Sequence, residues 1–142
     1  MAKRNGFSLL ELLIVVTIIL IIATIAIPTL LRSRQAANET HAVSNLRTLN
    51  TAEVQYVSNN MGLYGDISAL ISQGLLDFTY ASPNAGYVFN VGLGSGNYTA
   101  LATAFGANMG RYDYYSGPDY VIRYSTDPTR APTGLSGQPV NN

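Results

Sequence analysis

Residues 12–31 read LLIVVTIILIIATIAIPTLL, a run of twenty positions without an ionisable side chain. As a helix with a rise of about 1.5 Å per residue, this segment would extend about 30 Å, which is the thickness of the hydrocarbon core of a bilayer. Two basic residues precede the segment and two follow it, so the positive-inside rule does not decide its orientation. These four residues are Lys3, Arg4, Arg32 and Arg34. The sequence therefore predicts a membrane-spanning helix.

A cleaved secretory signal peptide is the alternative for this stretch. Lys3 and Arg4 would form its basic region, and residues 24–26 (TIA) offer a small-x-small cleavage sequence. The apolar run is longer than that of a usual signal, however, and Glu11 stands at its beginning, where an acid serves no purpose in a signal. These two features favour a helix that the mature protein keeps.

Glu11 is the most informative residue of the chain. An ionised carboxylate within lipid costs about 3 kcal/mol, so such a residue is expected to have a positively charged partner. No basic residue lies between Ser8 and Leu31. The partner is therefore expected to be the amino terminus of the chain itself or a group on another subunit.

The residues around Glu11 resemble a known processing motif. Residues 6–11 (GFSLLE), followed by the apolar run, resemble the N-terminal methylation motif of type IV prepilins and type II secretion pseudopilins. The resemblance extends to about residue 50 and includes Pro28, where the helix of that family commonly has a proline. It implies a pilin-like α+β fold with one long N-terminal helix.

The resemblance also implies how the chain is processed. Prepilin peptidase would cut the bond between Gly6 and Phe7 and then methylate the new amino group of Phe7. Gly6 has no Cβ, so the backbone there can enter a narrow site. The cut would create an α-amino group with an ordinary pKa of about 8, and methylation keeps it basic. This cation is expected to pair with Glu11 of the same chain or of a neighbouring subunit.

A protein of this family is a structural subunit of a type IV pilus or related filament, not an enzyme. The implied partners are further copies of the chain or other pilins, prepilin peptidase, an inner-membrane platform protein and an assembly ATPase. The precursor would cross the inner membrane once, with a periplasmic or extracellular head, and the mature form would lie in a surface pilus or a periplasmic pseudopilus. A type II secretion pseudopilin is the nearest alternative. A membrane-tethered binding module or enzyme is an alternative from another class.

Charge and composition argue against several other functions. Removal of residues 1–6 would leave six basic against eight acidic residues, a net charge of −2, which argues against nucleic-acid binding through bulk charge. The chain has no cysteine, so disulfides and thiolate metal ligands are excluded. His41 is the only histidine and is expected to be a solvated residue on a helix. No cofactor is expected.

Calcium is the one metal for which the sequence offers candidate ligands to consider. Asp113, Asp119 and Asp127 lie in or beside the C-terminal loops, and major pseudopilins can bind calcium in such loops through oxygen ligands. The spacing of the three residues matches no calcium-loop motif, so no metal site is predicted. Asp113 and Asp119 also make a weak candidate for a catalytic carboxylate pair, and no Ser/His/Asp or phosphate-binding signature accompanies them.

A long helix is predicted to follow the processing motif. No glycine or proline occurs between Pro28 and Gly62, so residues 7–59 are expected to form one helix with an interruption at Pro28. Pro28 lacks an amide hydrogen and should kink the helix, either as a tolerated irregularity or as a weak point that yields in the filament.

Beyond Arg34 the helix is expected to be amphipathic and to carry the head. Apolar residues that recur every three or four positions form the expected contact surface. They are Ala42, Val43, Leu46, Leu49 and Tyr56. Polar residues are expected on the other faces, namely Glu39, Arg47, Asn50 and Glu53.

The second half of the chain predicts a small α+β head. Asp66 is expected to cap a short helix that closes at Gly74. Strands are expected at residues 87–91, 98–105 and 119–125. Three or four antiparallel strands would pack against the long helix.

The expected division of the chain has five parts. They are a leader (1–6), a transmembrane or filament-core helix (7–31), an amphipathic helix (32–60), a globular α+β head (61–125) and a flexible tail (126–142). Within the head, residues 78–110 form an uncharged run of 33 residues, which would allow close neighbours in a polymer. Five tyrosines near the end of the head are expected to pack on the strands. They are Tyr112, Tyr114, Tyr115, Tyr120 and Tyr124.

Overall fold

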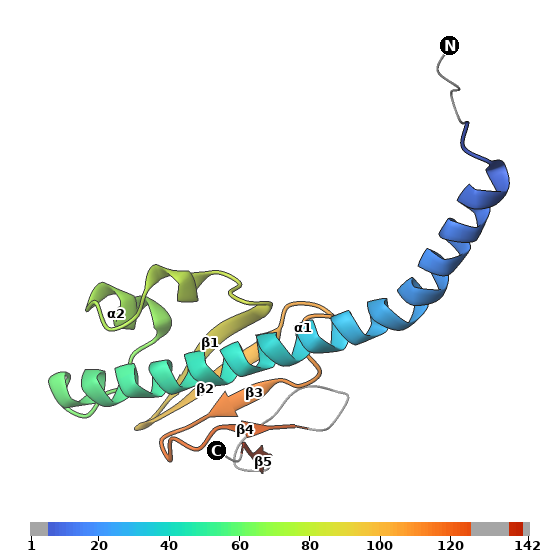
Figure 1. Cartoon of the computed structure of the whole chain (residues 1–142). Helices are drawn as coiled ribbons and strands as arrows, with labels where there is room; N and C mark the ends of the chain where they lie inside the picture. Colours follow the sequence, from blue (N-terminus) through green and yellow to red (C-terminus); the bar gives the residue numbers. More distant parts are fainter. Residues whose placement is uncertain (1–5, 126–136, 141–142) are drawn as a thin grey trace. The chain divides into compact units, whose positions relative to one another are not determined.

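The computed structural model describes residues 6–125 and 137–140. The chain divides into two compact units, Met1–Arg34 and Gln35–Asn142, and each unit is described by itself below. Helix α1 (Leu9–Asn59) runs through the boundary between them. The remaining elements, α2, the 3₁₀ helix η1 and strands β1 to β5, all belong to the second unit (Figure 1).

The first unit consists of the apolar start of α1. Among the described residues, α1 is the one helix that is both long enough and apolar enough to cross a membrane, and its most apolar part has a mean hydropathy of 3.0. The helix continues through Pro28, so the predicted interruption is not a break. Proline removes a single amide donor, and the helix bonds on either side of it remain. Threonine hydroxyls inside this segment donate to backbone oxygens of the preceding turn, for example Thr29 Oγ1 to Ile25 O at 3.1 Å.

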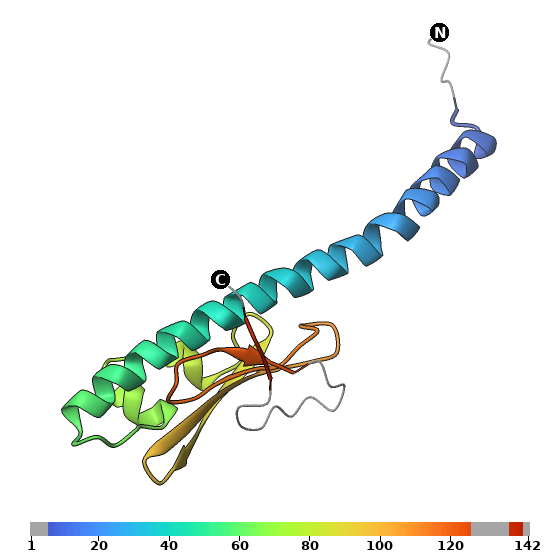
Figure 2. The ribbon, with the colours of Figure 1, turned by 90° about the horizontal axis from the view of Figure 1, so that it is seen from below.

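The second unit contains an antiparallel sheet whose strands follow one another in sequence order, β1-β2-β3-β4-β5. The strands are β1 (Tyr87–Gly94), β2 (Asn97–Ala104), β3 (Tyr114–Ser116), β4 (Arg123–Tyr124) and β5 (Gln138–Pro139). β1 and β2 form a hairpin with eight paired positions, drawn in yellow to orange in Figure 2. Gly96 in its tight turn has a φ of +67°, a conformation that favours glycine. The predicted α+β fold is confirmed.

Two strands lie where none was predicted. β3 falls between the expected second and third strands, and its three residues are too few to show an alternating pattern. β5 lies in the expected flexible tail, where Gln138 and Pro139 pair with β4. The rest of that tail, residues 126–136 and 141–142, lies outside the described residues.

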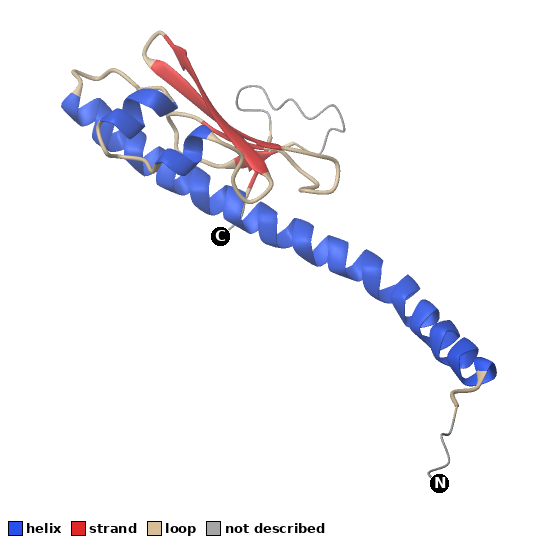
Figure 3. Ribbon diagram, turned by 90° about the horizontal axis from the view of Figure 1, so that it is seen from above, coloured by secondary structure: helices blue, strands red, loops and turns tan. Residues whose placement is uncertain are grey.

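The core of the second unit lies between one face of the sheet and the second half of α1 (Figure 3). The α1 side chains that reach it include Ala42, Leu46 and Leu49, as the sequence predicted. The sheet contributes alternate residues of β1 and β2, which are Tyr87, Phe89, Val91, Tyr98, Ala100 and Ala102. Alternation places these side chains on a single face.

Two short helices complete the core beside α1. The predicted short helix is present as α2 (Ile67–Ser72), and its N-cap Asp66 accepts a hydrogen bond from the Ala69 N–H at 2.7 Å. The helix η1 (Phe78–Ala81) was not predicted. It is capped in the same way by Asp77, which accepts from the Thr79 N–H at 2.8 Å.

The predicted positions of the polar residues of α1 are partly wrong. Arg47 is exposed as expected, but Glu39, Asn50 and Glu53 are buried against the rest of the head. A sequence pattern assigns polar residues to solvent because burial costs free energy unless a partner is present. Here the partners come from strands β2 and β3 and from loops that lie 12 or more residues away in sequence, so the pattern could not reveal them.

Candidate assembly site

The N-terminus of α1 is closed by a reciprocal pair of side chains. The Ser8 N–H donates to Glu11 Oε2 at 3.0 Å, and the Leu10 N–H donates to Ser8 Oγ at 3.3 Å. This is a capping box, in which two amide donors that the first turn cannot use within the helix are satisfied by side chains. The Ser-x-x-Glu spacing could have revealed Ser8, which the sequence analysis did not single out.

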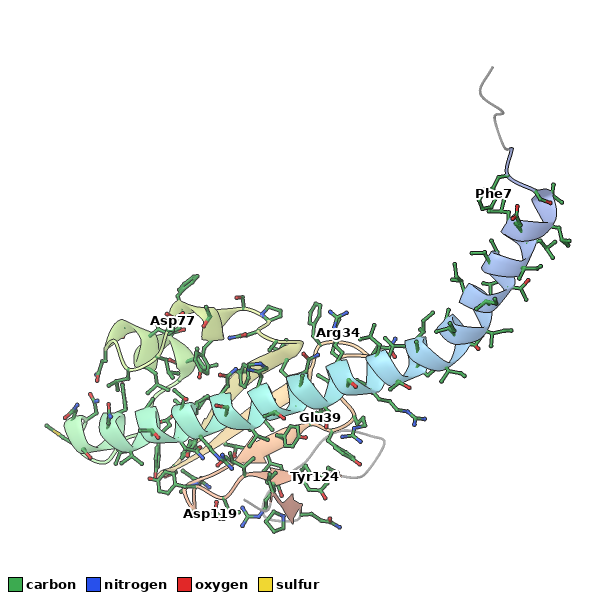
Figure 4. The ribbon with its side chains drawn as sticks, viewed as in Figure 1. Phe7, Arg34, Glu39, Asp77, Asp119 and Tyr124 are labelled. Carbon is green, nitrogen blue, oxygen red and sulfur yellow. The ribbon has the colours of Figure 1, made fainter. Side chains whose placement is uncertain are left out.

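Glu11 therefore has a local role at the start of the helix, and its pairing with an amino terminus stays a prediction. A carboxylate in the first turn of a helix is favoured by the positive end of the helix dipole. Phe7, next to Ser8 and ahead of the helix, is exposed (Figure 4). A Cβ at Gly6 would meet nothing within 4 Å, so no contact in the described structure explains a glycine there.

The apolar half of α1 leaves its side chains without protein cover in the described structure. From Leu9 to Arg34 every residue is exposed except Ala23, which is half-buried. A shallow apolar hollow lies near the N-terminal end, lined by Leu9, Leu12, Leu13, Val16 and Thr17. A continuous apolar surface of this kind marks contact with lipid or with other protein chains.

In the second unit, a buried acid joins α1 to the loop between β2 and β3. Glu39 accepts hydrogen bonds from Arg111 Nε at 3.0 Å, from Arg111 Nη2 at 2.8 Å and from the Arg111 N–H at 2.7 Å. The neighbouring Asn38 donates through Nδ2 to Met109 O at 2.8 Å. Figure 4 labels Glu39 on α1. The bidentate ion pair between Arg111 and Glu39 fixes this loop on the helix.

A second polar cluster joins α1 to the sheet about three to four turns further along the helix. The Tyr98 hydroxyl donates to Asn50 Oδ1 at 2.9 Å, and Asn50 Nδ2 donates to Ser116 Oγ at 2.8 Å. Glu53 Oε2 accepts from the Gly65 N–H at 3.1 Å, which fixes the loop after α1. Burial raises the pKa of the Glu53 carboxyl above its ordinary value, although the Gly65 bond acts in the opposite direction.

The aspartates considered for calcium have protein partners. Asp113 Oδ1 accepts from the Ala104 N–H at 2.9 Å, and Asp119 forms an ion pair with Arg123 at 2.6 Å. Asp127 lies outside the described residues. Within residues 6–125 and 137–140 no group of three metal-ligating side chains is found. His41 is exposed on α1, as predicted.

The first 27 residues match the family model of the prokaryotic N-terminal methylation motif. The chain is 40% identical over 75 residues to the type IV wide pilus major component PilA4 of Thermus thermophilus, which is 53% of this chain and 57% of that protein. It is 41% identical over 56 residues to the type IV major pilin protein PilA of Myxococcus xanthus, which is 39% of this chain and 26% of that protein. It is 34% identical over 58 residues to the type II secretion system core protein G of Escherichia coli, which is 41% of this chain and 40% of that protein.

These matches span little more than half of the first relative and less than half of the other two. They confirm the resemblance drawn from residues 6–11, and they include both kinds of filament protein that the sequence suggested. The chain therefore carries the prokaryotic N-terminal methylation motif, and its relatives are type IV pilins and the core protein G of type II secretion systems.

Proposed function

We propose that this chain is a structural subunit of a type IV pilus or a related filament and that it polymerises through the first half of α1. The observation that carries the proposal is the exposed apolar surface of residues 9–31, which contains Glu11 of the methylation motif near its start. In the membrane this surface would face lipid. In the filament it would face the same surface of other copies, so the apolar side chains would exchange one apolar environment for another.

Processing would supply the charge that Glu11 needs. Cleavage between Gly6 and Phe7 by prepilin peptidase would leave the Phe7 amino group one residue before Ser8, whose N–H already donates to Glu11 Oε2. The cationic amine of the same chain, or that of a neighbouring copy, would then pair with the carboxylate. In a low-dielectric filament core a subunit without this pairing would be disfavoured strongly.

The relationship to type IV pilins and to core protein G supports an assembly route. The precursor would span the inner membrane once, and a platform protein and an assembly ATPase would move it into the growing filament. Pro28 would be a point at which α1 bends as subunits pack, because the carbonyl of Thr24 lacks an amide donor there. The relationship to core protein G supports a periplasmic pseudopilus as the second candidate. Long fibres on the cell surface favour the pilus, and short fibres confined to the periplasm favour the pseudopilus.

Two variants of Glu11 separate pairing from capping. Glu11→Gln keeps an oxygen acceptor for the Ser8 N–H but removes the charge, and Glu11→Ala removes both. We expect both variants to be inserted and cleaved, with filament yield at least roughly tenfold lower, because loss of one member of a buried pair costs roughly 3–5 kcal/mol. Electron microscopy of sheared material measures the yield.

Mass spectrometry of the mature N-terminus provides the second measurement. A methylated Phe7 is the expected terminus in the parent chain and in both variants. An intact Met1 on the assembled protein would contradict the proposed cleavage. Normal filament yield from Glu11→Gln, with loss only in Glu11→Ala, would assign Glu11 to capping alone.

A further inference from the structure

Two loops of the head present apolar side chains to solvent. The loop that follows α1 exposes Met61 fully and Leu63 by 64%, and the loop before β4 exposes Tyr120 by 42% and Val121 by 38%. We call these four residues the loop patch. An exposed apolar group of this kind on a small domain is a candidate contact surface.

The two loops are held side by side by α1 and by their own side chains. Asn50 Nδ2 on α1 lies 3.4 Å from Tyr120 O. Tyr64, the neighbour of Leu63, interacts with the Tyr120 side chain and packs on the Tyr98 ring in a tilted arrangement, with 4.7 Å between the ring centroids. The two loops that carry the loop patch therefore lie side by side although they are distant in sequence.

The backbone of both loops is in an unfavourable conformation. Met61 and Tyr120 have φ values of +54° and +58°, in the left-handed region that large side chains rarely adopt. Such strain costs about 1–3 kcal/mol and persists where the surrounding structure imposes it, often at sites of interaction. In this protein the residues with the strained backbone, Met61 and Tyr120, carry two large side chains that lie at the surface.

An uncompensated negative charge borders the loop patch. Asp66 follows Tyr64 and Gly65, is exposed, and caps α2 through its carboxylate. Among the described residues no ion pair is found for Asp66, whereas Glu39 and Asp119 each have an arginine partner. The patch therefore combines apolar side chains with one acidic group.

The first unit contains a segment that complements the loop patch, because apolar side chains and positive charge lie next to each other in it. Leu30 and Leu31 are exposed by 69% and 42%, and they are followed by the exposed cations Arg32 and Arg34. The described part of the chain contains no ion pair for either arginine. This segment is the end of the apolar half of α1, where apolar side chains and positive charge occur together.

We propose that the loop patch of one copy docks onto residues 30–34 of a second copy, with Asp66 facing Arg32 or Arg34. This inference rests on the proposed filament and adds the surfaces through which the head of one copy meets helix α1 of the next. Two different surfaces that complement each other form a heterologous contact, and repetition of such a contact generates an open helical polymer. Burial of the apolar side chains provides attraction, and the charge pair fixes the register.

The absence of cysteine from the sequence allows a clean cross-linking test. The test variant carries Leu63→Cys and Leu30→Cys in the full-length chain, and assembled filaments are oxidised with a copper–phenanthroline catalyst. The matched control carries Leu93→Cys with Leu30→Cys, because Leu93 is also exposed but belongs to β1. A disulfide forms only when the two Cβ atoms approach to about 4 Å.

We expect a ladder of disulfide-linked multimers from the 63–30 pair that collapses on reduction. The 93–30 pair and each single-cysteine variant should stay largely monomeric on a denaturing gel. Filaments of the 63–30 variant that give no ladder, or an equal ladder from the 93–30 pair, would overturn the inference and leave the proposed function intact. If the unmodified chain forms no polymer, the proposed function and the inference both fail.

A charge variant tests the register without cysteines and covers the case in which the cysteine pair impairs assembly. Asp66→Asn keeps a side-chain acceptor for the Ala69 N–H but removes the charge, and Asp77→Asn makes the same change at the cap of η1. We expect roughly two- to fivefold fewer filaments from Asp66→Asn, which corresponds to the free energy that an exposed ion pair contributes. Asp77→Asn should give a normal yield. Equal yields from the two variants would remove Asp66 from the interface.

Discussion

The two halves of α1 use opposite kinds of residues for exposure and burial. From Leu9 to Leu31 almost every side chain is apolar and exposed. In the second half, Glu39, Asn50 and Glu53 are buried together with Leu46 and Leu49. One continuous helix therefore exposes leucine and isoleucine in one region and buries carboxylates in the other.

The difference shows that burial follows the available partner and not the polarity of the side chain. In the described residues the apolar side chains of the first half are exposed, and an apolar surface of this kind is a candidate for contact with lipid or with other chains. The second half packs on the sheet, where the β2–β3 loop brings Arg111 to Glu39 and the loop after α1 brings the Gly65 N–H to Glu53. Buried polar groups are tolerated where such hydrogen bonds exist.

The largest effect on head stability is expected from Leu49→Ala. Leu49 is fully buried against the sheet, and truncation of a buried leucine costs about 2–5 kcal/mol. The matched variant Leu20→Ala removes the same atoms from the exposed half of α1 and should leave head unfolding unchanged. Thermal unfolding of the detergent-solubilised chain, followed by near-ultraviolet circular dichroism, measures both. An equal loss in the two variants would contradict the contrast between the halves.

An intermediate effect is expected from Glu39→Ala. This variant removes the acceptor of three hydrogen bonds from Arg111 and should lower the free energy of unfolding by about 2 kcal/mol. His41→Ala is the control, since His41 is exposed on the same helix and its loss should change stability by less than about 0.5 kcal/mol. A stability of Glu39→Ala equal to that of the control would show that the ion pair contributes nothing.

The smallest effect is expected from Glu53→Gln, and it should depend on pH. Folding raises the pKa of Glu53 above its ordinary value of 4.5, so this carboxyl stabilises the head most when protonated. That contribution is fully present below pH 4.5 and is lost as pH rises through the folded-state pKa. Glutamine keeps the acceptor for the Gly65 N–H without the charge. The variant should therefore gain about 1 kcal/mol over the parent as pH rises from 4 to 8.

Unfolding midpoints of both chains at several pH values provide the measurement, and only their difference is used because other groups also titrate. The same comparison in an Asp66→Asn background tests the cause of the pKa shift, since the Asp66 charge contributes to the raised pKa of Glu53. In that background the pH-dependent advantage of glutamine should shrink. A constant difference between pH 4 and 8 would show that Glu53 keeps its ordinary pKa in the folded head.

Several features could be predicted because neighbouring residues specify them. The helix over residues 9–59 follows from the absence of glycine, although the interruption predicted at Pro28 is not a break, and α2 follows from Asp66 and Gly74 at its ends. The β1–β2 hairpin follows from alternation on both sides of a glycine-containing turn. The capping box at Ser8 was equally local and could have been found.

The amino-acid sequence by itself determined the apolar helix, the processing motif with its acid, and the α+β plan of the head, since periodicity and short-range spacing carry this information. Only the tertiary structure decided that Glu39, Asn50 and Glu53 are buried, that β3 and β5 join the sheet, and that the loop after α1 and the loop before β4 lie side by side. These features depend on partners that are far away in the chain. Residue type alone cannot reveal whether such a partner will be in place to satisfy a buried carboxylate or an unpaired strand.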